Sequence, residues 1–79
     1  MATFVVYAME MNAGFNLNMH SNLVIEADDK AEAMELLRSH LEELFRGISE
    51  VRLSSIGEWY VRQDNVTQYF WARSATVLK

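Results

Sequence analysis

The chain of 79 residues is 51% hydrophobic, carries a net charge of -4 and contains no cysteine. Its length predicts a single domain spanning residues 1–79 with a small core, because a chain of this size buries only about 60% of its unfolded surface. The lack of cysteine excludes disulfides and thiolate metal sites, which leaves oligomerisation, unusually good packing, or a metal held by nitrogen, oxygen or thioether ligands as sources of additional stability.

The charge is unevenly distributed along the chain. Residues 1–47 contain eight acidic and three basic residues, and residues 48–79 contain three acidic and four basic residues. Neither segment is the strongly basic patch that holds a phosphate backbone, so nucleic acid is a disfavoured partner. The N-terminal residues show no basic leader, and their apolar run ends at Glu10. The sequence therefore predicts a cytoplasmic protein with no signal peptide and no membrane contact.

The N-terminal third of the chain predicts a β-hairpin. Thr3 to Met11 is rich in β-branched and aromatic residues and is apolar on both faces, which is typical of a central strand. Asn12 to Gly14 fits a three-residue loop, because glycine adopts a positive φ without strain. Phe15 to Ala27 then alternates between apolar and polar residues, which is the pattern of a half-buried strand.

A single amphipathic helix is predicted after the hairpin. Asp29 fits the N-cap position, Glu32 completes a capping box, and Gly47 is a typical helix stop after a last residue near Arg46. The expected apolar stripe of this helix comprises Ala33, Leu37, Leu41 and Leu44, flanked by Met34 and Phe45.

Two further strands are predicted after the helix. The alternation from Val51 to Gln63 predicts one continuous strand, in which Ser55 and Gly57 form a gap of small residues on the inward face. Asp64-Asn65 fits a hairpin turn, and the last strand is expected to run from Val66 to about Val77.

The length of that turn sets the register of the second hairpin. A turn of two or four residues places Trp59 opposite Phe70 in the core. It also places Tyr60 opposite Tyr69 on the other face of the sheet. A three-residue turn would flip one strand and separate both pairs.

These elements predict an α+β domain of ββαββ order, with a four-stranded, mostly antiparallel sheet and one helix packed on one face. The favoured strand order is 2-1-3-4, because it centralises the doubly apolar first strand and makes every neighbouring pair antiparallel. An order of 1-2-3-4 with a right-handed parallel crossover is the alternative. The predicted core brings together Leu37, Leu41, Trp59 and Phe70.

The sheet face away from the helix is the first candidate binding surface. The side chains expected there are Tyr60, Arg62, Tyr69, Trp71 and Arg73, together with Ile56. Two arginines among three aromatic residues could stack single-stranded bases. A protein contact is favoured, because exposed apolar surface more often marks such a contact and the net charge is negative.

The tip of the first hairpin is the second candidate surface. A helix of eighteen residues would span about 27 Å and a strand of thirteen residues about 43 Å, so the helix cannot cover the whole inner face. The uncovered end is expected to carry Met9, Met11, Phe15, Leu17 and Met19. Flexible methionines are common on adaptable binding surfaces. Alternatively, the twist of the sheet and the chain termini cover this end.

Metal binding and catalysis have little support in the sequence. Thioether and imidazole groups could hold Cu(I), but Met19 and His20 are expected on opposite faces of a strand. His40 is expected to pack at the margin of the helix stripe rather than act as a general base. The sequence shows no glycine-rich phosphate loop, HExxH motif or nucleophile elbow. We therefore expect no metal, no cofactor and no enzymatic activity.

The resulting expectation is a non-catalytic interaction protein that binds a protein partner, or itself as a homodimer, through these two surfaces. A free-standing domain of this size is typical of small regulators and inhibitors, including those of phages and mobile elements. Two alternatives stay open. One is a single-stranded nucleic-acid-binding module that uses the aromatic face, and the other is a small enzyme or ligand carrier with a site between helix and sheet.

Overall fold

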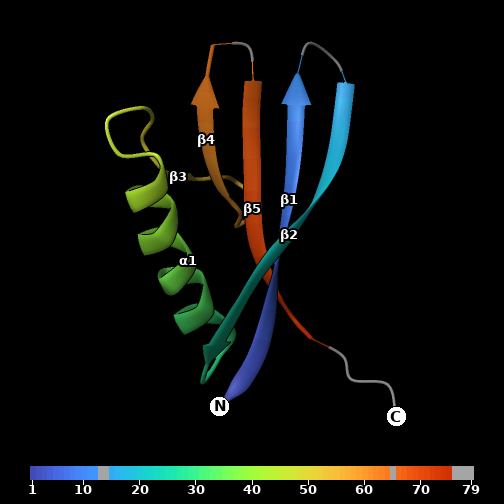
Figure 1. The fold of residues 1–79 in the computed structure, drawn as a ribbon, viewed down its shortest axis with the longest axis vertical. Helices are drawn as coiled ribbons and strands as arrows, with labels where there is room; N and C mark the ends of the chain where they lie inside the picture. The colour runs from blue at the N-terminus through green and yellow to red at the C-terminus, as the bar shows by residue number, and fades with distance from the viewer. Residues whose placement is uncertain (13–14, 65, 76–79) are drawn as a thin grey trace.

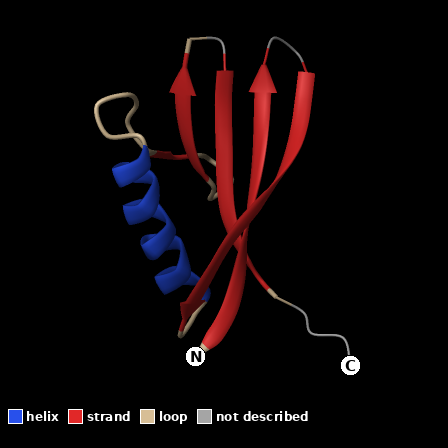
Figure 2. Cartoon of the chain, in the orientation of Figure 1, coloured by secondary structure: helices blue, strands red, loops and turns tan. Residues whose placement is uncertain are grey.

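The computed structural model describes residues 1–12, 15–64 and 66–75, without the side chains of residues 12–22. These residues form a twisted five-stranded antiparallel sheet with one helix against one face (Figures 1 and 2). The elements are β1 (Ala2–Asn12), β2 (Phe15–Ala27), α1 (Lys30–Leu44), β3 (Arg52–Leu53), β4 (Trp59–Gln63) and β5 (Val66–Ser74). The predicted α+β class is confirmed, although the described chain has one strand more than predicted.

The first hairpin places β1 in the interior of the sheet, as its sequence predicts. β1 lies between β2 and β5 and buries Phe4, Val6 and Ala8 on the helix side. It runs one residue beyond the predicted loop boundary, because Asn12 pairs with Phe15. Asn12, predicted as the first residue of the loop, therefore belongs to the strand. The other two residues of the predicted loop, 13–14, lie outside the described residues.

The register between β1 and β2 shifts near the middle of the hairpin. Val5 pairs with Val24, whereas Tyr7 pairs with His20. Three residues of β2 therefore stand opposite Val6 alone, which is a β-bulge. Bulges increase the local twist of a strand. The lower half of β2 crosses in front of β1 in Figure 1 and continues to the start of α1.

The helix begins as predicted at Asp29, whose carboxylate accepts a hydrogen bond from the backbone N–H of Glu32 at 2.8 Å. Its last residue is Leu44, two residues before the predicted end. The chain then turns at Gly47, whose φ of 76° confirms it as the helix stop, because glycine adopts this region without a Cβ clash.

The inner face of the helix is buried against the sheet. Ala33, Leu37 and Leu41 are 0% exposed, and the last two pack with Val6 and Trp59. Phe70 is partly buried at the edge of this cluster, so the predicted core is confirmed in its main part. Trp59 is oriented by a hydrogen bond of 2.8 Å from its Nε1 to the backbone oxygen of Met34, which leaves its buried N–H satisfied.

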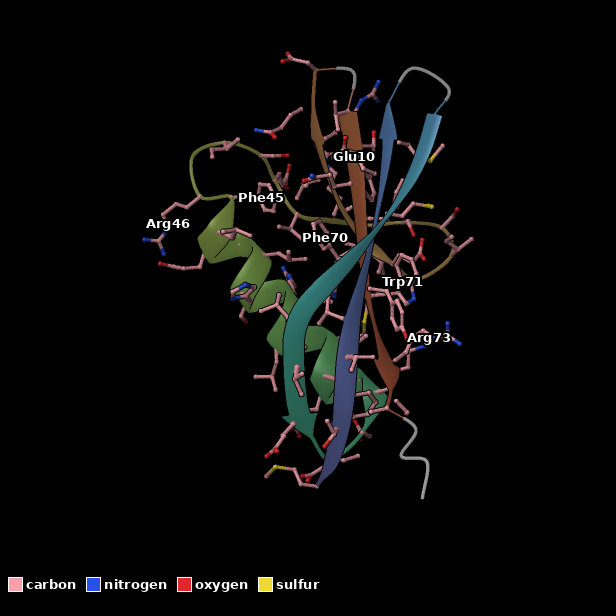
Figure 3. The ribbon with its side chains drawn as sticks, turned by 45° about the vertical axis from the view of Figure 1, so that its right-hand side comes forward. Glu10, Phe45, Arg46, Phe70, Trp71 and Arg73 are labelled. Atoms are coloured by element: carbon pink, nitrogen blue, oxygen red, sulfur yellow. The ribbon has the colours of Figure 1, made fainter. Side chains whose placement is uncertain are left out.

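One residue of the predicted helix stripe, and one predicted at its margin, are exposed instead. Leu44 is 58% exposed, and His40 is exposed rather than packed at the stripe margin. The predicted stripe is thus too long at its C-terminal end. Phe45, the residue that caps the end of α1, contacts Phe70 of the sheet at 6.2 Å between ring centroids (Figure 3).

The segment from residue 51 to 63 is two strands rather than one. The backbone N–H of Gly57 donates to the carbonyl of Ser54 at 3.1 Å, and Gly57 has a φ of 86°. The Ser54 hydroxyl accepts the N–H of Glu58 at 3.0 Å, which stabilises the same turn. The small residues predicted as a gap in one strand therefore form the reversal between β3 and β4.

This reversal makes the predicted strand order 2-1-3-4 wrong. The observed order is β2-β1-β5-β4-β3. A continuous strand after α1 would run antiparallel to β1 and could lie beside it. Because the chain turns back at Gly57, β4 runs in the same direction as β1 (Figure 1), and β5 is the strand that pairs antiparallel with β1.

The register of the second hairpin agrees with the prediction. Gln63 pairs with Val66, so the turn has two residues. Trp59 accordingly stands opposite Phe70, and Tyr60 stands opposite Tyr69. β5 ends at Ser74, which is earlier than the predicted Val77; residues 76–79 lie outside the described residues.

The buried stripe of the helix supplies a test of the core. Leu41→Ala should lower the free energy of unfolding by about 2–5 kcal/mol, because it leaves a cavity beside Leu37 and Trp59. Leu44→Ala, three residues further along the same helix, should change it by less than about 0.5 kcal/mol because Leu44 is exposed. Urea denaturation followed by circular dichroism measures both values, and equal effects would contradict the described helix orientation.

The reversal between β3 and β4 supplies a second test. Gly57→Ala should lower the free energy of unfolding by about 1–2 kcal/mol, because an L-residue pays that cost at positive φ. No atom lies within 4 Å of the added Cβ, so the cost is conformational rather than steric contact. Ser55→Ala in the same turn is the control, with an expected change under about 0.5 kcal/mol. A neutral Gly57→Ala in thermal or urea unfolding would argue against the turn.

Candidate functional site

The sheet face away from α1 carries a continuous group of aromatic, methionine and arginine side chains, here termed the open face. Figure 3 shows two of them, Trp71 and Arg73, projecting from β5 on the side opposite the helix. The alternation and register of the strands assign to the open face Val5, Tyr7, Met9, Met11, Arg52, Tyr60, Arg62, Thr67, Tyr69, Trp71 and Arg73.

Cross-strand pairing brings these residues together from four strands. Tyr7 of β1 stands opposite Trp71 of β5, and Met9 stands opposite Tyr69. Tyr69 stands in turn opposite Tyr60 of β4, which pairs with Arg52 of β3. Directly opposite residues lie close enough for their side chains to touch. The middle of the open face is therefore a row of apolar and aromatic groups across the sheet.

The aromatic rings contact one another. The rings of Tyr7 and Trp71 are stacked, with centroids 6.0 Å apart and planes 18° apart. Tyr60 and Tyr69 are 5.8 Å apart and tilted by 38°. The guanidinium of Arg73 lies over the ring of Tyr7 at 5.4 Å, a cation–π geometry. These contacts hold the rings in place and leave each of the four aromatic residues half-buried.

Fewer of the arginines on the open face form ion pairs than of the arginines in the helix layer. On the helix, Arg38 pairs with Glu35 and Glu42, each at 3.8 Å, and in the turn after it Arg46 pairs with Glu43. On the open face, Arg52 pairs with Glu50 at 3.0 Å. Among the described residues, Arg62 and Arg73 have no ion pair. The open face therefore carries positive charge that the described residues do not compensate.

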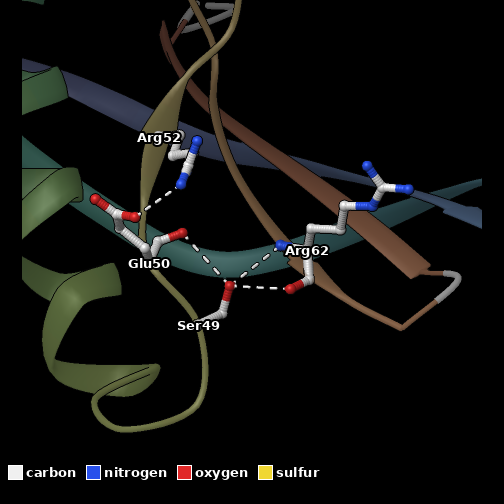
Figure 4. Close-up of polar contacts among 4 residues, drawn as sticks. All are labelled: Ser49, Glu50, Arg52 and Arg62. Atoms are coloured by element: carbon white, nitrogen blue, oxygen red, sulfur yellow. Dashed lines mark hydrogen bonds and ion pairs between the residues drawn. The ribbon is translucent and has the colours of Figure 1, made fainter.

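A groove runs along the outer edge of β4, beside the open face. It is lined by Ile48, Ser49, Glu50, Arg52, Tyr60, Arg62 and Asp64. One lining residue, Ser49, binds the edge of β4: its hydroxyl accepts the backbone N–H of Arg62 at 3.2 Å and donates to the carbonyl of Arg62 at 3.1 Å (Figure 4). One side chain thus satisfies both edge groups of Arg62, as a neighbouring strand would.

The structure brings together most of the residues predicted for this face. Tyr60, Arg62, Tyr69, Trp71 and Arg73 all lie on it, as predicted. The predicted sixth residue, Ile56, lies in the turn between β3 and β4, where it is 75% exposed.

The sequence reasoning missed the contribution of β1 to the open face. Val5, Tyr7, Met9 and Met11 lie on it because β1 pairs with β5. The signal available in the sequence was the double apolar character of β1, which requires a covered face on one side and an apolar neighbour on the other. Without the strand order, that neighbour could not be identified.

The pairing of β1 with β2 does not place the residues predicted at the hairpin tip opposite one another. Met9 pairs with Asn18 and Met11 with Asn16, whereas Leu17 pairs with Glu10. The two methionines of β1 are therefore one row of the ladder away from Phe15, Leu17 and Met19, whose side chains lie outside the described residues. On the helix side of this end, Gln68 donates a hydrogen bond of 3.2 Å to the carboxylate of Glu10. That described part is polar rather than apolar.

In the described part of the chain, no group of three or more His, Asp or Glu residues could hold a metal ion. No helix there is long and apolar enough to cross a membrane. His20 belongs to the residues whose side chains are not described, so the predicted separation of Met19 and His20 stays a prediction.

Comparisons with protein families, curated proteins and solved structures find no match to this chain.

The stacked pair at the centre of the open face supplies a third test. A double-mutant cycle on Tyr7→Leu and Trp71→Leu should give a coupling of about 0.5–1.5 kcal/mol, the range found for contacting aromatic rings. A matched cycle on Tyr7→Leu and Tyr60→Leu should give little coupling, because β5 separates these residues. Urea denaturation of the single and double variants measures both couplings. Equal values in the two cycles would contradict a specific stack.

Proposed function

We propose that the protein is a non-catalytic binding module whose open face docks a protein partner with an acidic and apolar surface. One observation carries the proposal: the open face gathers tyrosine, tryptophan, methionine and arginine on a sheet face that no described element covers. These are the residue types enriched at the cores of protein interfaces, where lysine, glutamate and aspartate are depleted. All three tyrosines of the chain lie there.

The charge of the face specifies the chemistry of the partner. The guanidinium groups of Arg62 and Arg73 have no carboxylate partner among the described residues, although the chain as a whole has a net charge of -4. Carboxylates of a docked protein would complete these pairs with charge-assisted hydrogen bonds. Electrostatic complementarity of this kind orients a partner and speeds its association.

The geometry favours a protein over single-stranded nucleic acid. A base-binding platform needs ring faces on which bases can stack. Here the Tyr7 ring is engaged by Trp71 on the sheet and by the guanidinium of Arg73. Two uncompensated arginines are also few for a polyanion, since such binding relies on many phosphate contacts and the overall charge is repulsive.

The same charges disfavour face-to-face packing of two open faces. A two-fold axis through the face would bring the unpaired arginines of both copies toward each other. Like charges in an interface weaken association, so a partner with a different surface fits this face better. A module that binds without a reactive group acts by covering a surface of its partner, which is the action of a regulator or inhibitor.

A charge-swap experiment tests the proposal. Three tagged baits are incubated with lysate of the source cells treated with nuclease: the native chain, Arg62→Glu with Arg73→Glu, and Lys30→Glu with Arg46→Glu at the start of the helix and in the turn after it. The two double variants change the net charge equally. A partner that docks on the open face should bind at least about tenfold more weakly to the first variant and unchanged to the second.

The site of contact is checked by photo-cross-linking. A benzophenone amino acid at Val24, which is 59% exposed and pairs with Val5, should cross-link the captured protein. The same group at Ser39 on the helix should not. The open face would be refuted as the binding site if both charge variants captured the partner equally weakly, or if cross-linking occurred from Ser39 alone. Capture that depends on nucleic acid would favour the nucleic-acid alternative.

A further inference from the structure

The two edges of the sheet differ in how much unpaired strand backbone they present. β2 has thirteen residues and forms one edge, and no described strand pairs with its outer side. In Figure 1 its upper half runs along the right-hand border of the fold with no ribbon beyond it. Such an edge presents a row of backbone N–H and C=O groups that another strand can pair with.

The sequence of β2 lacks most of the features that usually protect an edge. Natural sheets block edges with lysine, proline, very short strands, β-bulges or inward-pointing charges. β2 contains no lysine, arginine or proline, and Glu26, near its end, is its one acidic residue. The bulge opposite Val6 interrupts pairing in the middle of the strand but leaves the segment from Phe15 to His20 in continuous register with β1.

The opposite edge is closed to a strand. β3 has two residues, which pair with Tyr60 and Trp59 of β4. Further along β4, the Ser49 hydroxyl binds both the N–H and the carbonyl of Arg62. A strand approaching this edge would have to displace the Ser49 loop. Head-to-tail addition, in which the β2 edge of one copy meets the β4 edge of the next, is therefore blocked.

We propose that two copies of this chain pair through their β2 edges, antiparallel, along the segment from Phe15 to His20. An antiparallel strand is complementary to itself under a two-fold axis perpendicular to the sheet, so the contact closes after two copies. This axis leaves both helices on one side and both open faces on the other. The dimer thus joins two sheets into one and doubles the binding face at the side of Met9 and Met11.

This pairing also meets a need of the chain. A small domain without disulfides gains stability when a second subunit satisfies polar backbone groups and adds buried area. It is compatible with the proposed function, because it uses the edge of the sheet and leaves Arg62 and Arg73 accessible. The two proposals rest on different residues, so each can fail without the other.

Light scattering after gel filtration tests the dimer, with an expected mass twice that of the 9.1 kDa chain. Asn16→Lys with Asn18→Lys places lysines of both copies along the shared edge, and should give a monomer of native circular dichroism. Asn16→Glu with Asn18→Glu should do the same. A mixture of the two should form a dimer again, because each lysine then faces a glutamate. Gln63→Lys, an exposed position at the far side of the sheet, should stay dimeric.

Cross-linking locates the contact independently of charge. The chain has no cysteine, so a single Asn18→Cys can be joined to its copy by a short bismaleimide. Gln63→Cys should not cross-link under the same conditions. A native chain that is monomeric at all accessible concentrations would overturn the proposal. A dimer unaffected by the lysine pair, or cross-linked through residue 63 instead of 18, would overturn it as well.

Discussion

The reversal of the chain between Ser54 and Gly57 is the constraint on which the rest of the structure depends. The hydrogen bond from Gly57 to Ser54 and the positive φ of Gly57 turn the chain back after a two-residue strand. The direction of every later strand follows from this turn. β4 runs in the same direction as β1, and β5 lies between them and pairs antiparallel with β1 over nine residue pairs. A chain that continued straight would give a different sheet from nearly the same hydrophobic pattern.

The pairing of β1 with β5 creates both sides of the molecule. On the helix side it sets Val6 beside Ala72, both nearly fully buried, and the backbone N–H of Ala72 donates to the Met34 sulfur at 3.4 Å. On the other side the same ladder sets Tyr7 against Trp71. One face of the sheet is thus covered by α1, against which the Trp59 indole packs. The other face is an aromatic surface that no described element covers.

The distribution of ion pairs follows the same division into two layers. The helix layer neutralises its arginines locally, through glutamates three or four residues away, which helical spacing makes possible. Residues two positions apart on a strand share a face, and Arg52 forms an ion pair in this way with Glu50. Arg62 and Arg73 have no ion pair among the described residues, and the residues directly opposite them are Thr67 and Val5. An overall acidic protein consequently presents a basic, aromatic face.

The sequence by itself determined the helix, its Asp29 cap, the register of Trp59 with Phe70, and five of the arginine and aromatic residues of the open face. These depend on local periodicity and on short turns, which neighbouring residues specify. The tertiary structure alone decided the strand order and hence the place of Tyr7 and Met9 on the same face. Alternation with a period of two shows that a strand has two different faces, but it does not show which strand lies beside it. The turn at Gly57 made β5, rather than the strand directly after the helix, the neighbour of β1.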